Sequence, residues 1–598
     1  MRLSKLYSNQ PSVFEPLFFA EGLNVVLAEI RLPENKDKDT HNLGKTTLGQ
    51  LIDFCLLSTR DADMFLIRYP NLFSAFVFYI ELSLLDGSFV TVRRGVDEAS
   101  KISFKRHPLG HQDFSDIPDS MWDHAQMPFE RSREMLDGIL NLTGLKDWSF
   151  RKGLGYLLRS QDDYHDVFQL ARFASAHVDW KPYLGGILGF DSRLIESHYK
   201  KEEELKEQEE TVSTINKELG GTIEDVSKVE GILQLKINEA EKKQTLLDAF
   251  DFRAQDKDRV KIVLDEFDVK IGELNNRRYS LMVNKKRIGL ALADEQIDFD
   301  PAVAATVFAD AGVVFAGQIK QDFEQLIGFS RALTLERRKY LEEELKEIEA
   351  ELKDVNLSLN DLGKKRGKAL AFLSSTDTFQ KYRQISDELV GVRADIVSLE
   401  RQKTYLHRLQ ELRGSIRKLR DDCRKLQAKI EENVEEQNSK TGGCFAKIRG
   451  LFSEVIEEVI DRKALLTVKS NQLGHLEFKA EILDEAGNAT SADKGNSYRK
   501  LLCVAFDMAV LRAHLDEEFP RFLYHDGALE TLDDRKKENL IVVMRQYASL
   551  GIQQIITLID SDLPKRTPGE GPVFEDSEIM LRLHDEDESG RLFKMPSW

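Results

Sequence analysis

The middle of the chain carries a hydrophobic repeat that restricts it to long, paired helices. Apolar residues recur without interruption at alternating spacings of four and three, at Leu341, Leu345, Ile348, Leu352, Val355, Leu359 and Leu362. This spacing places one apolar stripe along a helix and is typical of a coiled-coil seam. Charged residues make up 31% of the 598 residues and there are only 14 prolines, which suits long helices better than additional globular units.

Two further repeats extend the helical region in both directions. An earlier series runs through Val212, Ile215, Leu219, Thr222, Val226, Val229 and Leu233. A later one runs through Leu409, Leu412, Ile416, Leu419, Cys423, Leu426 and Ile430, out of step with Val392, Ile396 and Leu399, which predicts a discontinuity. Pro301, Gly312 and Gly317 interrupt the segment between the helical halves. We predict an outgoing helix over 197–296, a tip over 297–330 and an antiparallel returning helix over 331–440.

The two ends of the chain read as mixed α/β structure. "LNVVLAEIR" has strand length, and "FSAFVFYIELSLLDGSFVTVRR" predicts a hairpin around Asp86-Gly87. Towards the C-terminus, "RKALLTVKSNQLGHLEFKAEILDEAG" predicts paired strands, "YRKLLCVAFDMAVLRAHL" a buried helix, and "RFLYHDG" and "IQQIITLID" short strands. Residues 1–196 and 441–598 are therefore predicted to form two halves of one α/β head.

The segment after the first predicted strand resembles a phosphate-binding loop. Gly44, Lys45 and Thr46 match the G-K-[ST] end of a P-loop, but Asp39 stands where the first glycine belongs. A helix is expected from about Lys45, with Leu48, Leu51, Ile52 and Cys55 facing inward. "LGKTT" alone is often a chance match, and the flanking strand and helix favour a nucleotide site. Predicted nucleotide contacts are Asn42, Gly44, Lys45, Thr46 and Thr47.

A second segment offers the partner that a P-loop needs. The apolar strand at 522–524 leads to Asp526, and a parallel sheet places ligands at the carboxyl ends of its strands. Asp526 is thus a Walker B candidate that would hold Mg²⁺ together with Thr46. Gly527 occupies the position where a catalytic glutamate usually follows. Glu530 is the nearest carboxylate and a candidate base, with a solvated surface carboxylate as the alternative.

Four other positions complete the predicted site. Gln161 follows an apolar stretch as a Q-loop glutamine would, contacting Mg²⁺ and the attacking water, although an ordinary polar loop residue is the alternative. Gly495 and Ser497 precede a predicted helix where a signature motif would lie, suited to a γ-phosphate from another subunit. Asp533 resembles a D-loop aspartate. Asp560 stands near the position of a switch histidine and is a third catalytic candidate.

The order of P-loop, Q-loop, coiled coil, signature, Walker B and D-loop resembles the SMC/RecN-type ABC ATPases. "DAGVVFAGQIKQDFEQL" and "AEIRLPENKDKDTHNLGKTTL" more narrowly resemble the short SMC-like ATPases of bacterial antiphage defence systems, Lamassu-like or ABC-three-component. The resemblance implies ATP and Mg²⁺ as cofactors and a homodimer through the heads and the tips. It also implies a co-encoded effector such as a nuclease, an accessory subunit, and contact with double-stranded DNA. A RecN-like repair ATPase and an ATP-stapled scaffold remain as alternatives.

Composition sets limits on these expectations. The net charge of −18 means that any DNA contact needs a local patch, such as Arg93-Arg94, Lys105-Arg106 or 285–287, although such clusters are more often solvated or ion-paired. Four scattered cysteines without a CxxC pair exclude a zinc hook and suit a reducing cytoplasm. No secretory signal and no apolar run of ~20 residues is present. We expect a cytoplasmic protein without membrane contact.

Overall fold

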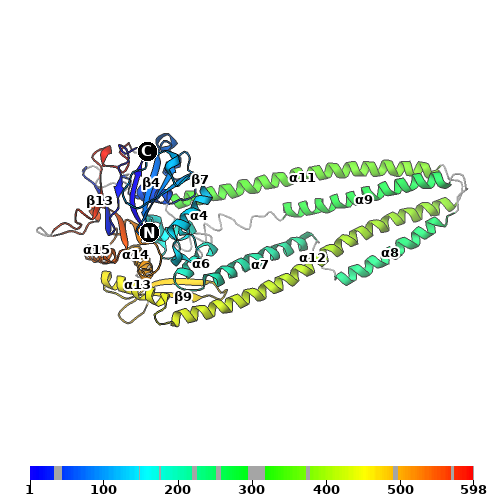
Figure 1. Ribbon diagram of the computed structural model, residues 1–598. Helices are drawn as coiled ribbons and strands as arrows, with labels where there is room; N and C mark the ends of the chain where they lie inside the picture. Colours follow the sequence, from blue (N-terminus) through cyan, green and yellow to red (C-terminus); the bar gives the residue numbers. More distant parts are fainter. Residues whose placement is uncertain are drawn as a thin grey trace. The chain divides into compact units, whose positions relative to one another are not determined.

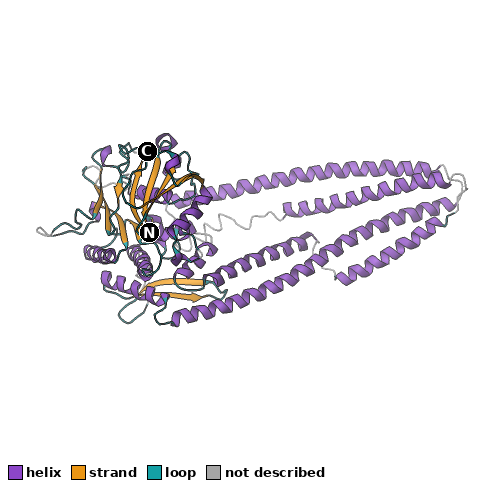
Figure 2. Cartoon of the chain, viewed as in Figure 1, coloured by secondary structure: helices purple, strands orange, loops and turns teal. Residues whose placement is uncertain are grey.

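The structure is a computed structural model that divides into two compact units. It describes residues 1–32, 43–146, 148–173, 177–218, 225–250, 257–293, 317–371, 377–488, 496–566, 571–596 and 598. The head unit combines Met1–Glu203 with Asp421–Trp598, and the rod unit is Glu204–Arg420. The sheets belong to the head unit and the rod unit is helical (Figure 2). The predicted mixed α/β class is confirmed for the head.

A five-stranded parallel sheet interleaves the two ends of the chain. Its order is β13-β3-β12-β11-β8. The strands are β3 (Leu23–Glu29), β8 (Leu158–Arg159), β11 (Phe522–Asp526), β12 (Gln553–Ile559) and β13 (Ile579–His584). The predicted strands β3, β11 and β12 are confirmed. Because all five run in one direction, their carboxyl ends meet at a single edge.

A six-stranded antiparallel sheet and a separate hairpin complete the β structure of the head. The sheet has the order β2-β1-β4-β5-β6-β7. Its strands are β1 (Arg2–Ser8), β2 (Leu17–Phe18), β4 (Val77–Ser83), β5 (Phe89–Gly95), β6 (Lys101–His107) and β7 (His124–Pro128). The predicted hairpin is β4–β5, turning at Gly87 with φ of 83°. The other predicted pair is β9 (Ala464–Ser470) with β10 (Leu476–Ile482).

Helices of the head pack around these sheets. They are α1 (Lys45–Cys55), α2 (Phe65–Arg68), α3 (Pro70–Phe73), α4 (Phe129–Leu140), α5 (Phe150–Leu157), α6 (His177–Ile187), α13 (Cys444–Ile460), α14 (Asn496–Ala513) and α15 (Asp534–Ser549). Helix α1 buries Leu48, Leu51, Ile52 and Cys55, as its spacing predicts. One continuous core includes Val25 and Leu48 from the first half and Leu502 and Ile556 from the second. Neither half therefore completes this core alone.

The rod is built from five described helices. They are α7 (Ser192–Glu218), α8 (Val226–Asp248), α9 (Lys257–Ala293), α11 (Gly317–Ala371) and α12 (Asp377–Ser439), of which α7 begins and α12 ends in the head unit. Of the predicted tip, residues 297–316 lie outside the described residues and 317–330 belong to α11. The predicted discontinuity between Leu399 and Leu409 does not interrupt α12.

Apolar seams and ion pairs define how the rod helices pair. Along α9 and α11, Ile348 and Val355 are buried in one cluster with Leu281 and Ile288. Helices α8 and α12 pair in an antiparallel manner. Lys236 forms an ion pair with Asp395 at 2.9 Å, and Lys243, further along α8, forms one with Glu388, which precedes Asp395 in α12. The repeats predicted from sequence thus do form paired seams, with each arm divided among several helices.

The rod also turns back on itself. Asp268 of α9 accepts a hydrogen bond of 3.1 Å from Ser386 of α12, and Tyr279 accepts one of 2.8 Å from Ser398. Residue numbers rise together in these two contacts, so α9 runs parallel to α12, whereas α8 runs antiparallel to it. The chain therefore reverses between α8 and α9, and Figure 1 shows α9 and α11 lying side by side. The sequence pattern predicted only the reversal at the tip.

Among the described helices, none is both long and apolar enough to cross a membrane.

Candidate functional site

The sequence-predicted site residues gather at the carboxyl edge of the parallel sheet. Lys45 opens α1 after β3, and Gln161 opens a short 3₁₀ helix, Gln161–His165, after β8. Asp526 ends β11, and Asp560 opens a 3₁₀ helix, Asp560–Asp562, after β12. Four strand ends therefore deliver polar side chains to one edge, and the outermost of them, at Ile30 and Asp560, lie 530 positions apart in the chain.

Gly44 is required by the geometry of the loop that leads into α1. Its φ is 101°, in the left-handed region that favours glycine. A side chain there would also collide with Leu592, whose N–H donates to the Leu43 carbonyl at 3.0 Å. The C-terminal segment thus supports the loop, a contact that the sequence did not predict. Asn42 and Asp39 lie outside the described residues.

The start of α1 is fixed against β11. The Tyr524 hydroxyl donates a hydrogen bond of 2.8 Å to the Lys45 carbonyl, and Gly49 leaves room for the same ring. A Cβ at Gly49 would lie 2.8 Å from the Tyr524 ring. Thr47 follows on the first turn of α1. This close approach holds the helix N-terminus, with its partial positive charge, at the edge of the sheet.

Thr46 and Asp526 form the central contact of the site. The Thr46 hydroxyl donates to Asp526 Oδ2 at 2.8 Å, and the Thr557 hydroxyl donates to Asp526 Oδ1. Two neighbouring oxygen ligands of an octahedral Mg²⁺ lie about 2.9 Å apart, since each is 2.0–2.1 Å from the ion. The Thr46 and Asp526 oxygens therefore fit that ion, while Thr557 fixes the carboxylate from the opposite side.

Glu530 is held beside Asp526 by two residues. Gln161 Nε2 donates to Glu530 Oε1 at 3.0 Å, and Lys500 Nζ lies 2.8 Å from Glu530 Oε2. Lys500, on α14, also donates to the Gly527 carbonyl at 3.0 Å. The predicted Q-loop glutamine and the predicted base are therefore in direct contact, across 369 positions of sequence.

Gly527 explains how Glu530 reaches this position. Gly527 has φ of 68°, and a Cβ there would collide with the Glu530 carboxyl group. The carboxyl group thus occupies the space into which a side chain at 527 would project. The predicted Walker B aspartate is followed by a glycine, and the carboxylate next to that glycine belongs to Glu530, three residues further on.

Lys45 lies in an acidic surrounding. Burial lowers the pKa of Lys45, and nearby carboxylates partly offset that effect. These carboxylates belong to Asp526, Glu530, Asp562 and Asp560. Asp560 Oδ2 accepts a hydrogen bond of 3.3 Å from the Ile30 N–H, which ties β3 to the end of β12. Burial also raises the pKa of Asp562, against the effect of its bond from the Ile559 N–H, and Glu530 adds to the increase.

A buried ion pair between Arg159 and Asp507 holds the segment next to Gln161 in place. Arg159, at the end of β8, donates to both carboxylate oxygens of Asp507 on α14, at 2.7 and 2.8 Å. It also donates to the carbonyls of Asp163 and Val167 in the segment after Gln161. Burial opposes the charge on Arg159, but Asp507 raises its pKa well above the ordinary value. This pair fixes the segment that carries Gln161.

Several predicted residues are not brought to this edge by described contacts. Gly495 lies outside the described residues, and Ser497 is the second residue of α14. Asp533 is the N-cap of α15 and accepts a hydrogen bond of 3.1 Å from the Lys536 N–H. It also forms an ion pair with Lys536 Nζ at 2.7 Å. These contacts lower the pKa of Asp533.

The basic clusters considered for DNA contact are engaged elsewhere. Arg94 is buried and donates to the Phe54, Ser58 and Ala99 carbonyls, so it is a structural residue. The neighbouring clusters form ion pairs, which are Arg93–Asp119, Lys105–Asp123, Arg106–Asp86 and Lys285–Glu349. These basic residues are therefore ion-paired within the chain, which was the alternative to DNA contact.

Three residues of the site were missed by sequence reasoning. Thr557 lies inside an apolar strand, Lys500 on a largely buried helix, and Asp562 two residues beyond the predicted Asp560. The "DSD" sequence could have suggested Asp562. No local pattern distinguishes Thr557 or Lys500, because their roles depend on partners in other elements.

A known protein family matches the C-terminal part of the chain. A family model described as "Uncharacterised protein conserved in bacteria (DUF2326)" matches residues 455–597. The comparison with curated proteins found no match.

Solved structures of Smc head domains are similar to the chain. One, with a coiled coil and joint, from Pyrococcus yayanosii, has 14% identity and a TM-score of 0.32, covering 93% of this chain and 92% of that one. Another, from Pyrococcus furiosus, has an extended coiled coil bound to the C-terminal domain of ScpA; it has 11% identity and a TM-score of 0.31, covering 94% and 90%. A third, an SmcHead bound to the C-winged helix domain of ScpA, has 18% identity and a TM-score of 0.18, covering 23% and 42%.

Proposed function

We propose that the chain is an SMC-like ATPase subunit whose head binds ATP and Mg²⁺ at the carboxyl edge of the parallel sheet. The observation that carries this proposal is the 2.8 Å contact between Thr46 and Asp526. It joins a G-K-T helix start to a strand-end aspartate, the two groups that Mg²⁺–nucleotide binding requires. Gln161 and Glu530 lie in contact with each other beside that pair.

Each residue has a distinct role in this proposal. Lys45 and the first N–H groups of α1 attract the phosphates, with Asn42, Gly44 and Thr47 completing the loop. Thr46, Asp526 and Gln161 would hold Mg²⁺, which neutralises phosphate charge when bound. Glu530 accepts a proton from the attacking water, and Gln161 orients its carboxylate. Asp560 holds β3 and β12 in register near Lys45.

The second half of the site would come from another copy of the chain. Gly495, Ser497 and Asp533 of that copy would contact the γ-phosphate, so that two heads close on two nucleotides. Closure requires ATP to bind the closed state more tightly than the open state. By the resemblance described above, closure would respond to DNA and control a co-encoded effector in antiphage defence.

The test is ATP binding and steady-state turnover by the full chain, with and without linear double-stranded DNA. Lys45→Ala should abolish binding. Glu530→Gln should keep binding and reduce turnover by about 10²–10⁴-fold, the usual loss for a general base. Glu485→Gln, which changes an exposed carboxylate, is the matched control. Failure of the wild-type chain to bind ATP would contradict the proposal.

A hydrolysis-poor, ATP-stapled scaffold is the second candidate. It is favoured by one observation, that Lys500 already pairs with Glu530 at 2.8 Å. Under this hypothesis the wild-type chain binds ATP tightly and Lys45→Ala abolishes binding. ATP turnover by the wild-type chain is then as low as turnover by Glu530→Gln, with or without DNA.

A further inference from the structure

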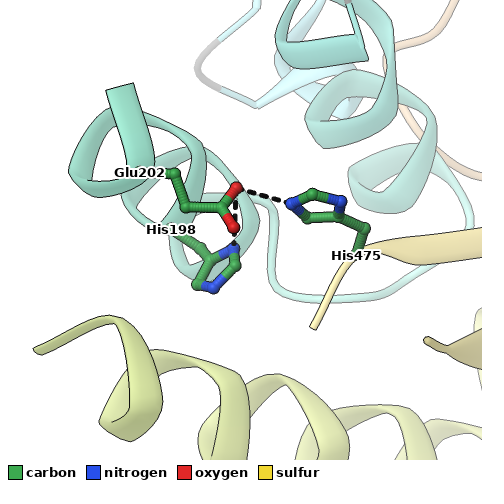
Figure 3. Close-up of side chains that lie close together, drawn as sticks. All are labelled: His198, Glu202 and His475. Atoms are coloured by element: carbon green, nitrogen blue, oxygen red, sulfur yellow. Dashed lines mark hydrogen bonds and ion pairs between the residues drawn. The ribbon is translucent and has the colours of Figure 1, made fainter. Parts of the chain in front are cut away.

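Two histidines and a glutamate, none of them assigned to the nucleotide site, converge in the head unit. His198 and Glu202 are four residues apart near the start of α7, so they share one face of that helix. His475 follows the tight turn after β9 and precedes β10. Figure 3 shows the Glu202 carboxylate lying between the two imidazole rings.

The donor atoms of these side chains are close enough to share one ion. Glu202 Oε2 lies 2.5 Å from His475 Nε2 and 3.8 Å from His198 Nδ1, and all three ligand atoms lie within 4.8 Å of one another. Ligands of a tetrahedral Zn²⁺ are about 3.3 Å apart, because each lies 2.0–2.1 Å from the metal. Small side-chain rotations would bring the three atoms to that spacing.

The burial of His198 is the most informative feature of this cluster. The residue is almost fully buried, at 2% exposure, and its Nδ1 atom has no hydrogen-bond partner among the described residues. Buried polar atoms are nearly always satisfied, so an unsatisfied one next to a carboxylate and a second imidazole needs an explanation.

The third residue is fixed before any ion binds. Asn471 Oδ1 accepts hydrogen bonds from the N–H groups of Leu473 at 2.9 Å and His475 at 3.1 Å. The Tyr199 ring stacks on the His475 ring with centroids 4.7 Å apart. Gly474 supplies the positive φ of 81° that the turn needs. His475 is therefore held toward α7 by its own turn and by a neighbouring aromatic ring.

We propose that His198, Glu202 and His475 form a binding site for a divalent transition-metal ion, with Zn²⁺ as the best match. Two imidazoles and one carboxylate suit Zn²⁺ and its neighbours, and leave a fourth position for water. The bound ion would tie the start of α7 to the β9–β10 hairpin within the head unit. This inference does not depend on the proposed ATPase function.

The test uses the full chain, purified with a tag that contains no histidine and stripped with EDTA. Zn²⁺ binding is measured by competition with a chromophoric chelator, and metal content by mass spectrometry after desalting. We expect one Zn²⁺ per chain and a higher melting temperature with Zn²⁺ than with EDTA. Co²⁺ should give the visible absorption band of a four-coordinate site.

Substitutions then locate the site. Glu202→Gln keeps the side-chain volume and should weaken Zn²⁺ binding by at least ~100-fold, as should His475→Gln, with loss of the Co²⁺ band. His124→Gln, an exposed histidine of β7, should leave both unchanged. The melting temperature of each variant in EDTA shows whether its fold is intact. The melting temperatures of the wild-type chain with Zn²⁺ and with EDTA test the site even if a variant fails to fold.

Two results would overturn the proposal. One is a wild-type chain that retains no Zn²⁺ and melts identically in Zn²⁺ and EDTA; the cluster would then be a hydrogen-bonded Glu202–His475 ion pair only. The other is Zn²⁺ binding of equal strength in wild type, Glu202→Gln and His475→Gln, which would place the metal elsewhere.

Discussion

Thr46 and Asp526 are in hydrogen-bond contact at 2.8 Å although 480 positions separate them in the sequence. The contact exists because β3 and β11 belong to one parallel sheet, with β12 between them. The rod inserted between the two head segments therefore does not prevent the ends of the chain from building a single site.

The Thr46 hydroxyl is expected to be needed for Mg²⁺-dependent nucleotide binding. Thr46→Val preserves shape but removes the oxygen, so the affinity for Mg²⁺–ATP should fall about 10-fold or more. Thr46→Ser retains the oxygen and should bind nearly as well as wild type. Fluorescent ATP titrations with Mg²⁺ and with EDTA measure both effects, and equal affinities for the two variants would remove Thr46 from the site.

Gly527 is expected to keep the Glu530 carboxyl group in place. Gly527→Ala would strain a residue with φ of 68° and crowd Glu530, so turnover should fall while ATP binding remains. The backbone strain itself should cost on the order of 1–3 kcal/mol. Gly487→Ala is the matched control, because Gly487 has φ of 82° with open space around it. Similar turnover in the two variants would show that Glu530 does not depend on this space.

Asp507 is expected to be among the most sensitive positions of the head. Asp507→Ala leaves Arg159 charged and buried, so the free energy of unfolding should drop by about 3–5 kcal/mol. The double variant Arg159→Met/Asp507→Leu removes both charges and should be more stable than the single variant. Chemical denaturation of all three, with Glu485→Ala as an exposed control, measures the difference. A double variant less stable than Asp507→Ala would contradict the argument.

His514 is expected to make the stability of the head depend on pH. Its Nε2 donates to the Ile187 carbonyl at 2.8 Å, and its Nδ1 lies 3.0 Å from Glu517. Despite the opposing effect of burial, contacts with Cys444, Glu517 and the Ile187 carbonyl raise the pKa of His514 from 6.5 to about 9. The protonated ring therefore stabilises the fold fully below pH 6.5, and this contribution is lost as pH rises through about 9.

The corresponding measurement compares denaturation midpoints at pH 6 and pH 9.5. A difference of about 2.5 between the two pKa values corresponds to at most about 3 kcal/mol. His514→Gln should lose most of the change that wild type shows over this interval. His124→Gln should retain it. An unchanged pH profile in His514→Gln would assign the effect to other groups.

The reversal of the rod is expected to be detectable by cross-linking. Tyr279 and Ser398 are hydrogen-bonded at 2.8 Å, so cysteines at both positions should be joined within one chain by a short bis-maleimide. Each single variant controls for the native cysteines, and the pair Tyr279→Cys with Val397→Cys tests the neighbouring, exposed position. Equal yields for both pairs would show that the α9–α12 contact does not persist in solution.

By itself, the sequence determined the elements whose signals are local. Alternation placed the β4–β5 and β9–β10 hairpins, heptads placed the apolar seams, and the G-K-T motif after a strand placed the start of α1. These signals are readable because each depends on neighbours within one or two turns of backbone. The same logic identified Asp526 as a strand-end residue.

Only the tertiary structure decided which of these residues meet. Glu530 could equally have been a solvated carboxylate; its contacts with Gln161 and Lys500 arise from three separate elements. The reversal of the rod, which brings Tyr279 against Ser398, likewise has no periodic signature. A contact between distant segments depends on how whole elements pack, and a side-chain pattern along one element does not encode its partner across space.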